Sequence, residues 1–242
     1  MMENSKLPIR KWYLAMAFMS YSKKGISAKE LQRQLEHNRY ESIWTMMHRI
    51  RKAMGQRDDR YNLEDMIEFD EAYFTIDSGK RKGQKLKRGK GSQKKTNVAV
   101  MAESIPLEDI ETGEKSKHCR YFKMKVLKNH NSEEIDKVIK DNIDEASIVF
   151  SDKSKSYVDI SQYIDVHVSQ KSSNETTINT LPWVHIAISN AKRTLLGIYH
   201  RIKGKYLQLY LDEFCYKLNR RYFGNRIFDR LTVAVAMQNN YG

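Results

Sequence analysis

Cysteine is scarce in this chain, acidic residues are fewer than basic ones, and long apolar runs are missing. The two cysteines, Cys119 and Cys215, have no paired spacing, so neither a disulfide framework nor a thiolate zinc site is predicted. The N-terminus lacks the apolar core of a secretory signal, and the stretch from Trp12 to Met19 is too short to span a bilayer. We therefore expect a cytoplasmic protein with no membrane partner.

Motifs of two common enzyme classes are also missing. The Gly-Lys-rich tract lacks the GxxxxGK[ST] spacing of a nucleotide-binding loop, and no nucleophile elbow is present. The sequence therefore gives no support to either of these two enzyme classes.

The charge of the chain is strongly positive, with 43 Lys and Arg against 30 Asp and Glu, a formal net charge of +13 and a pI near 9.5 over 242 residues. Phosphate backbones are the obvious partner for this excess, the alternatives being a merely soluble cationic protein or one that binds anionic lipid. The segment from Gly79 to Lys95 contains no acid and predicts a cationic loop; the alternative is a solubilising hairpin tip. The residues of this loop that we expect to contact DNA are Lys80, Arg81, Lys82, Lys85, Lys87, Arg88 and Lys90.

The N-terminal region, residues 7 to 54, has a helical pattern in three segments. Ser27 and Glu30 form a capping-box sequence ahead of the second segment. The third, residues 40 to 54, has an apolar stripe with basic polar positions that we expect to contact DNA, Arg49, Arg51 and Lys52. The pattern is typical of a helix-turn-helix, although any small helical subdomain with a solvated basic face would look the same.

A polar linker at residues 55 to 60 separates two regions. We predict a helical DNA-binding region at residues 1–60 and a catalytic domain with a C-terminal helical tail at residues 61–242. The second region has an α/β pattern, with strands predicted near residues 66–71, 97–102, 120–127, 147–150 and 165–168 and helices at 132–143, 155–162 and 183–199. This order is typical of a mixed sheet flanked by helices.

Two of the short apolar runs deliver a carboxylate at or near their end, Asp70 in the first and Asp152 in the second. If folding brings these acids together, they would repel each other unless a cation lay between them, and Mg²⁺ is the natural choice because it prefers hard oxygen ligands. The alternatives are an ordinary exposed strand acid at 70 and a helix-capping loop at 152.

Four segments together resemble bacterial insertion-sequence transposases of the ISXO-like group, in the DDE superfamily. They are Glu68 to Phe74, Ser151 to Tyr157, Leu181 to Arg193 and Tyr206 to Arg221. The resemblance implies an RNase H-like α/β core, preceded by the all-α helix-turn-helix unit, in which two aspartates and a residue on a late helix hold two Mg²⁺ ions, with Mn²⁺ as the alternative.

Carried over residue by residue, the resemblance places the acids at Asp70 and Asp152 and the third ligand at Asn190. Asn190 departs from the usual Glu, so part of the catalytic burden is assigned to Lys192. For His185, a core histidine is favoured over a substrate contact.

Three functions remain open at this point. The first is a transposase that cleaves and transfers strands at the terminal inverted repeats of its element, bound to these repeats and to target DNA as a homo-oligomer in the bacterial nucleoid. The second is a catalytically impaired DNA-binding remnant or regulator, which Asn190 and the lack of the zinc ribbon usual in relatives would favour. A nuclease that cuts without joining is a third reading.

Overall fold

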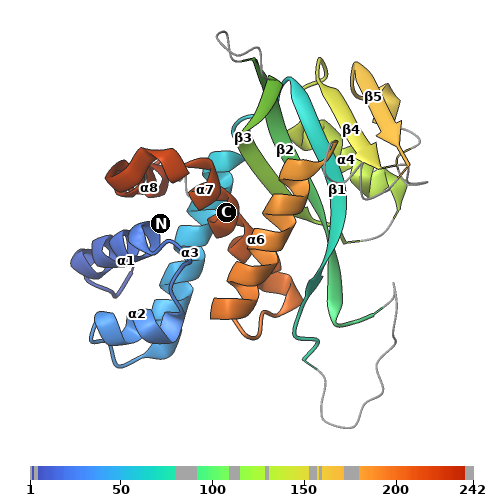
Figure 1. Cartoon of the computed structure of the whole chain (residues 1–242). Coiled ribbons are helices and arrows are strands. Elements are labelled where there is room, and N and C mark those ends of the chain that lie inside the picture. The colour runs from blue at the N-terminus through green and yellow to red at the C-terminus, as the bar shows by residue number, and fades with distance from the viewer. Residues whose placement is uncertain are drawn as a thin grey trace. The chain divides into compact units, whose positions relative to one another are not determined.

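The computed structural model describes residues 2, 5–79, 92–108, 115–128, 131–152, 157, 160–171 and 180–237. These residues form two compact units that each draw on separate stretches of the chain (Figure 1). Unit 1 comprises residues 1–60, 193–200 and 209–242, and unit 2 comprises residues 61–192 and 201–208. The unit changes at residue 60, where the sequence predicts a boundary, but the C-terminal tail belongs with the N-terminal helices.

Unit 2 is built on a five-stranded mixed sheet with the order β3-β2-β1-β4-β5. Strands β1 (Met66–Thr75), β2 (Lys95–Glu108) and β3 (Lys115–Val126) form an antiparallel meander. Strands β4 (Ile148–Asp152) and β5 (Val166–Gln170) continue the sheet in parallel with β1. This is the mixed sheet that the sequence predicts.

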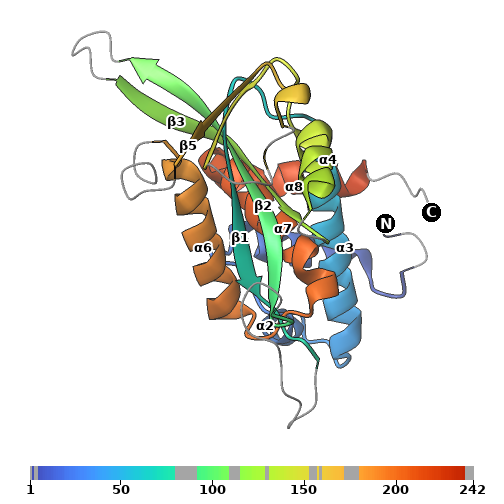
Figure 2. The same ribbon diagram turned by 90° about the vertical axis from the view of Figure 1, so that its right-hand side faces the viewer.

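A helix covers each face of this sheet (Figure 2). Helix α4 (Ser132–Asn142) packs Ile135 and Ile139 against one face, in a buried cluster with Ile67 and Phe69 of β1. Helix α6 (Pro182–Ile198) runs along the other face, and its part up to Lys192 belongs to unit 2. Because side chains alternate along a strand, the face that receives α6 is the one that carries Glu68 and Asp70.

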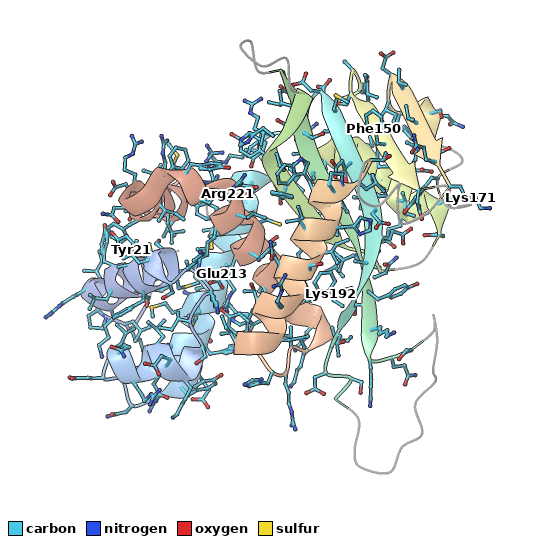
Figure 3. All side chains as sticks on the ribbon, viewed as in Figure 1. Tyr21, Phe150, Lys171, Lys192, Glu213 and Arg221 are labelled. Atoms are coloured by element: carbon cyan, nitrogen blue, oxygen red, sulfur yellow. The ribbon has the colours of Figure 1, made fainter. Side chains whose placement is uncertain are left out.

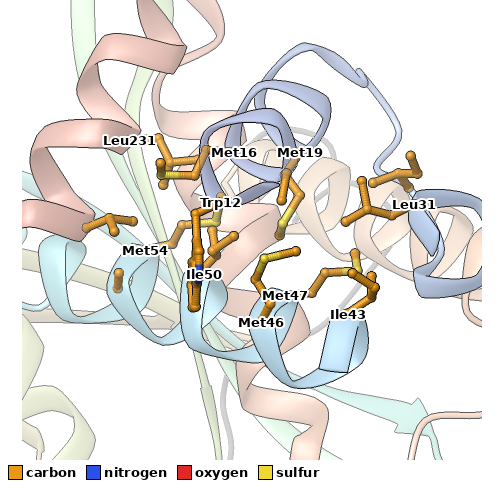
Figure 4. Close-up of a cluster of buried hydrophobic side chains, with 14 of the residues drawn as sticks. Trp12, Met16, Met19, Leu31, Ile43, Met46, Met47, Ile50, Met54 and Leu231 are labelled. Carbon is orange, nitrogen blue, oxygen red and sulfur yellow. The ribbon is translucent and has the colours of Figure 1, made fainter. Parts of the chain in front are cut away.

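Unit 1 contains the three N-terminal helices, α1 (Ile9–Tyr21), α2 (Ala28–Gln34) and α3 (Tyr40–Asp58), at the predicted places. Most of helix α7 (Leu207–Asn219) and all of helix α8 (Ile227–Ala236) join them. One apolar core holds the unit together (Figure 4), with Trp12, Met16, Met47 and Leu231 buried in it. The tail therefore supplies part of the core on which the N-terminal helices pack.

Short 3-10 turns complete the described fold: η3 (Ile160–Gln162), η4 (Gly204–Tyr206) and η5 (Arg221–Arg226). The predicted cap of α2 forms on one side only: the hydroxyl of Ser27 accepts from the backbone N–H of Glu30, whereas the Glu30 carboxylate bonds Arg33 and Gln34. Among the described residues, none of the helices combines the length and the apolar character that crossing a membrane requires.

Candidate active site

The two predicted aspartates lie on neighbouring parallel strands. The register of β1 and β4 pairs Phe69 with Ser151, and the next residue on each strand is an aspartate, Asp70 and Asp152. Adjacent strands are about 4.8 Å apart, so this register sets the two carboxylates beside each other. The carboxyl ends of the parallel strands form the edge of an α/β sheet at which ligands collect.

Burial and mutual repulsion act on both carboxyl groups. Burial, together with the charges of Asp152 and Glu71, raises the pKa of Asp70 to about 6, against the opposing effects of the Glu71 N–H and Lys192. Burial also raises the pKa of Asp152, with Glu71 adding to the effect and His185 opposing it. The two carboxylates repel each other when both are ionised, and a cation bound between them would relieve this repulsion.

Glu71 is close enough to the two aspartates for its charge to act on both, and Tyr157 is hydrogen-bonded to it. We call Asp70, Asp152 and Glu71 the acid cluster. Glu71 accepts hydrogen bonds from the amide of Asn97 and from Tyr157, whose ring stacks edge-on against Phe69 at 5.3 Å between centroids. Burial raises the pKa of Tyr157, and the charges of Glu71, Asp70 and Asp152 raise it further. Tyr157 is therefore a neutral donor that holds Glu71 in place.

The N-terminus of α6 is fixed to β1 by Glu68. This side chain is 1% exposed, and its Oε2 accepts from the backbone N–H groups of Trp183 at 2.8 Å and Val184 at 3.0 Å. The first N–H groups of a helix have no partner within the helix, and Pro182 suits the first helical position because it has no N–H to satisfy. The residue that follows these two amides is His185.

His185 is the side chain of α6 that the structure brings to the aspartates. Its Nε2 lies 3.9 Å from Oδ2 of Asp70, with the two side chains 37% and 17% exposed. Burial lowers the pKa of His185, and Asp152 opposes that effect. His185 is thus not the core histidine that the sequence favours but lies beside the acid cluster.

Lys192 lies on the same side of α6 as His185. Seven residues correspond to almost two full turns, so the two side chains differ by only about 20° around the helix axis. The Nζ of Lys192 is 5.6 Å from the centroid of the Phe74 ring, and its charge lowers the pKa of Asp70. Lys192 projects from α6 in Figure 3. Its predicted place beside the acids agrees with these contacts.

Asn190 projects from a different side of α6 than His185. Five residues turn a helix by about 140°, so Asn190 lies across the buried stripe of Val184, Ala187 and Ala191 from the histidine. His185 and Asn190 thus flank opposite sides of the face that packs on the sheet, and a ligand at Asn190 stays a prediction.

The donor set fits a divalent cation. Oδ1 of Asp152 is buried and has no hydrogen-bond partner among the described residues. Two ligands of one octahedral ion are separated by roughly 3 to 4 Å, which includes the 3.9 Å between His185 and Asp70. Over the part of the chain that the structure describes, no ready-made group of three His, Cys, Asp or Glu side chains is present. A cation would therefore have to draw these side chains slightly together.

The basic residues predicted on α3 differ in exposure. Arg49 and Lys52 are exposed, whereas Arg51 is 1% exposed and its Nε donates to Glu213 Oε2 at 2.7 Å. Arg51 also lies over the ring of Tyr210, 4.2 Å from its centroid. The prediction of Arg51 as a DNA contact is therefore corrected, since its charge is paired inside unit 1. The seven predicted loop residues, 80 to 90, lie outside the described residues.

Comparison with known families identifies the chain. Residues 62–219 match the model of the ISXO2-like transposase domain. The chain belongs to this transposase family. A comparison of this transposase with curated proteins found no match.

Solved structures of Mos1 transposase are similar to this transposase at low scores. The catalytic domain of Mos1 mariner transposase has 13% identity and a TM-score of 0.36, covering 78% of this chain and 92% of that chain. The Mos1 paired-end complex with the left transposon end has 14% identity and a TM-score of 0.34, covering 99% and 82%. The Mos1 catalytic domain with raltegravir and Mg has 13% identity and a TM-score of 0.35, covering 81% and 96%. These scores are too low to place side chains by superposition.

The sequence named Asp70, Asp152 and Lys192 as candidate site residues, favoured a core role for His185 and did not point to Glu68 or Tyr157. A signal for His185 was available, because the apolar stripe Val184, Ala187 and Ala191 defines which side of the helix packs. His185 and Lys192, seven residues apart, border that stripe on one side. Glu68 gave no comparable signal, since its partners are backbone groups more than a hundred residues away.

Proposed function

We propose that this protein is a DNA transposase that cleaves and joins strands at the ends of an insertion sequence with a bound divalent cation. The observation that carries the proposal is the adjacency of Asp70 and Asp152 on parallel strands, with His185 at 3.9 Å from Asp70, in a chain of the transposase family.

Asp70, Asp152 and His185 would hold the cation, with His185 in the place expected for Asn190. When bound, the cation supplies Lewis-acid stabilisation of the charge that develops on the phosphoryl group and the leaving oxygen. Carboxylates suit both Mg²⁺ and Mn²⁺, but an imidazole nitrogen suits the transition metal better. We therefore propose that Mn²⁺ supports the reaction at least as well as Mg²⁺.

The side chains around the cation would orient the DNA phosphate and balance the charge that develops during the reaction. In cleavage, the oxygen of water forms a bond to phosphorus, the bond to the 3′ oxygen breaks, and that oxygen takes up a proton. In strand transfer, the freed 3′-hydroxyl attacks a second phosphodiester in the same way, so no oxidant or reductant is needed. Lys192, on the same side of α6 as His185, contributes a positive charge to which a DNA phosphate can pair.

DNA binding is assigned mainly to unit 1 and to the net charge of +13. Arg49 and Lys52 are exposed on α3, the last helix of the predicted helix-turn-helix. The cationic segment of residues 80 to 90 adds further phosphate contacts. The partners would be the terminal inverted repeats and the target DNA, bound by a homo-oligomer.

The competing function, a remnant that binds DNA without catalysis, loses the support that Asn190 gave it. Its main argument was a neutral amide in the third ligand position. With His185 as the third ligand, as proposed here on its contact with Asp70, the neutral amide at 190 would not weaken the metal site.

The test uses a duplex that carries the terminal repeats from the DNA flanking the coding region. Asp70→Asn and Asp152→Asn are expected to abolish nicking and strand transfer in Mn²⁺ or Mg²⁺, with DNA binding unchanged. Glu64→Gln, an exposed acid of the same unit, is the control and should cleave like the wild type. Undiminished cleavage in both aspartate variants would reject the proposal, and nicks without joined products would indicate a nuclease.

A further inference from the structure

Glu68 and Asp70 lie two residues apart on the same face of β1, and the residues they contact follow one another in α6. The Glu68 carboxylate binds the backbone N–H groups of residues 183 and 184, while Asp70 lies 3.9 Å from the side chain of residue 185. A strand rises about 6.6 Å over two residues. One short piece of β1 therefore determines both where α6 begins and how far His185 is from the metal-binding acid.

The capping bond is strong for a contact between distant segments. Glu68 is 1% exposed, and a carboxylate that accepts two N–H groups at 2.8 and 3.0 Å makes charge-assisted bonds about twice as strong as neutral ones. A negative charge at the N-terminus of a helix is also favoured by the helix dipole.

We infer that Glu68 is a positioning residue: by capping α6 it sets the distance between His185 and Asp70, and with it the affinity of the site for a divalent cation. The inference rests on the proposed function for its metal. Loss of groups that orient metal ligands typically costs about 10- to 100-fold in metal affinity.

The variants are Glu68→Ala, which removes the cap, and Glu68→Gln, which keeps the size and one neutral acceptor. Ile67→Ala is the matched control, because Ile67 is the preceding residue of β1 and is equally buried but packs toward α4. It tests whether a mere loss of stability in this strand explains the result.

The first readout needs no metal: the NMR signals of the His185 ring and the hydrogen exchange of the Trp183 and Val184 amides. In Glu68→Ala, the ring signals are expected to move and the two amides to exchange faster, with smaller changes in Glu68→Gln and none in Ile67→Ala. The second readout is Mn²⁺ affinity by calorimetry on the folded full-length variants. The expected loss is about 10- to 100-fold for Glu68→Ala and about 3- to 10-fold for Glu68→Gln.

Wild-type signals and affinity in Glu68→Ala would overturn the inference, as would equal losses in Ile67→Ala. If Glu68→Ala does not fold, wild-type values in Glu68→Gln overturn it. Should the wild-type protein bind no Mn²⁺, the proposed function fails, and the ring signals and amide exchange alone then decide whether Glu68 positions His185.

Discussion

The buried ion pair between Arg51 and Glu213 leads to a prediction that separates a structural arginine from a DNA-binding one on the same helix. Both side chains are almost fully buried, 1% and 5% exposed, at 2.7 Å (Figure 3 labels Glu213). The Arg51 Nη2 also donates to the hydroxyl of Tyr199 at 3.2 Å. Removing Arg51 would leave only Lys217, 4.0 Å from Glu213, to compensate for the buried carboxylate. Breaking a buried pair in this way costs about 3–5 kcal/mol.

We therefore predict that Arg51→Ala lowers the free energy of unfolding of unit 1 by about 3–5 kcal/mol. Arg49→Ala, two residues away and exposed, should change it by less than about 0.5 kcal/mol. Urea denaturation followed by the fluorescence of Trp12 and Trp44, which lie in this unit, measures both. The double variant Arg51→Met with Glu213→Leu should recover only part of the loss, because it removes the Arg51–Glu213 pair as a whole but also takes Glu213 away from the buried Lys217, 4.0 Å from it.

For DNA binding, we expect Arg49→Ala to have the larger effect and Arg51→Ala the smaller one. At low temperature, where the variants stay folded, Arg49→Ala should weaken binding and reduce the slope of log K against log salt by about one. Arg51→Ala should leave the slope unchanged. The reasoning is refuted if Arg51→Ala unfolds like the wild type while it reduces the salt slope.

Three further outcomes are expected. Burial, assisted by Arg51, lowers the pKa of His48 from 6.5 to about 4. Between these pH values the unfolded chain binds more protons than the folded one, so the free energy of unfolding falls as the pH drops. In urea denaturation the wild type should therefore lose about 2–3 kcal/mol more than His48→Gln between pH 7 and 4.5. Gly25 has φ +102° and an added Cβ would lie 2.9 Å from the Tyr199 hydroxyl, so Gly25→Ala should cost about 1–2 kcal/mol in the same assay, whereas Gly197→Ala, with open space, should cost nothing. Metal titrations of cleavage should show that Mn²⁺ acts at lower concentrations than Mg²⁺ and that His185→Glu reduces this preference.

Each of these outcomes has a clear opposite. Parallel pH profiles of the wild type and His48→Gln would mean that His48 titrates normally in the folded protein. Equal stability of the two glycine variants would remove the argument for a left-handed turn between α1 and α2. An unchanged metal preference in His185→Glu would argue against an imidazole ligand.

The sequence predicted what depends on local pattern. Alternation along residues 66–71 placed Glu68 and Asp70 on one face, and the apolar run before Asp152 was read as a central strand, which the sheet order confirms. The predicted helices of the N-terminal region lie where expected because their apolar stripes and the Ser27 cap are local signals.

What the sequence did not predict depends on partners far along the chain. Arg51 looked like one more basic position on a polar face, since its partner Glu213 lies 162 residues away. The contact between His185 and Asp70 was not predicted, because a motif gives the order of residues but not the rotation of the helix against the sheet. That rotation is set by the apolar stripe and by Glu68.

The most direct test of the account compares His185→Ala with Asn190→Ala. In the Mn²⁺-loaded wild-type protein, pulsed electron paramagnetic resonance should detect a nitrogen nucleus coupled to the metal. We predict that His185→Ala loses this coupling and most of the strand cleavage, while Asn190→Ala keeps both. Retention of the nitrogen coupling in His185→Ala, or loss of metal and cleavage in Asn190→Ala alone, would contradict the arrangement described for Asp70, Asp152 and His185.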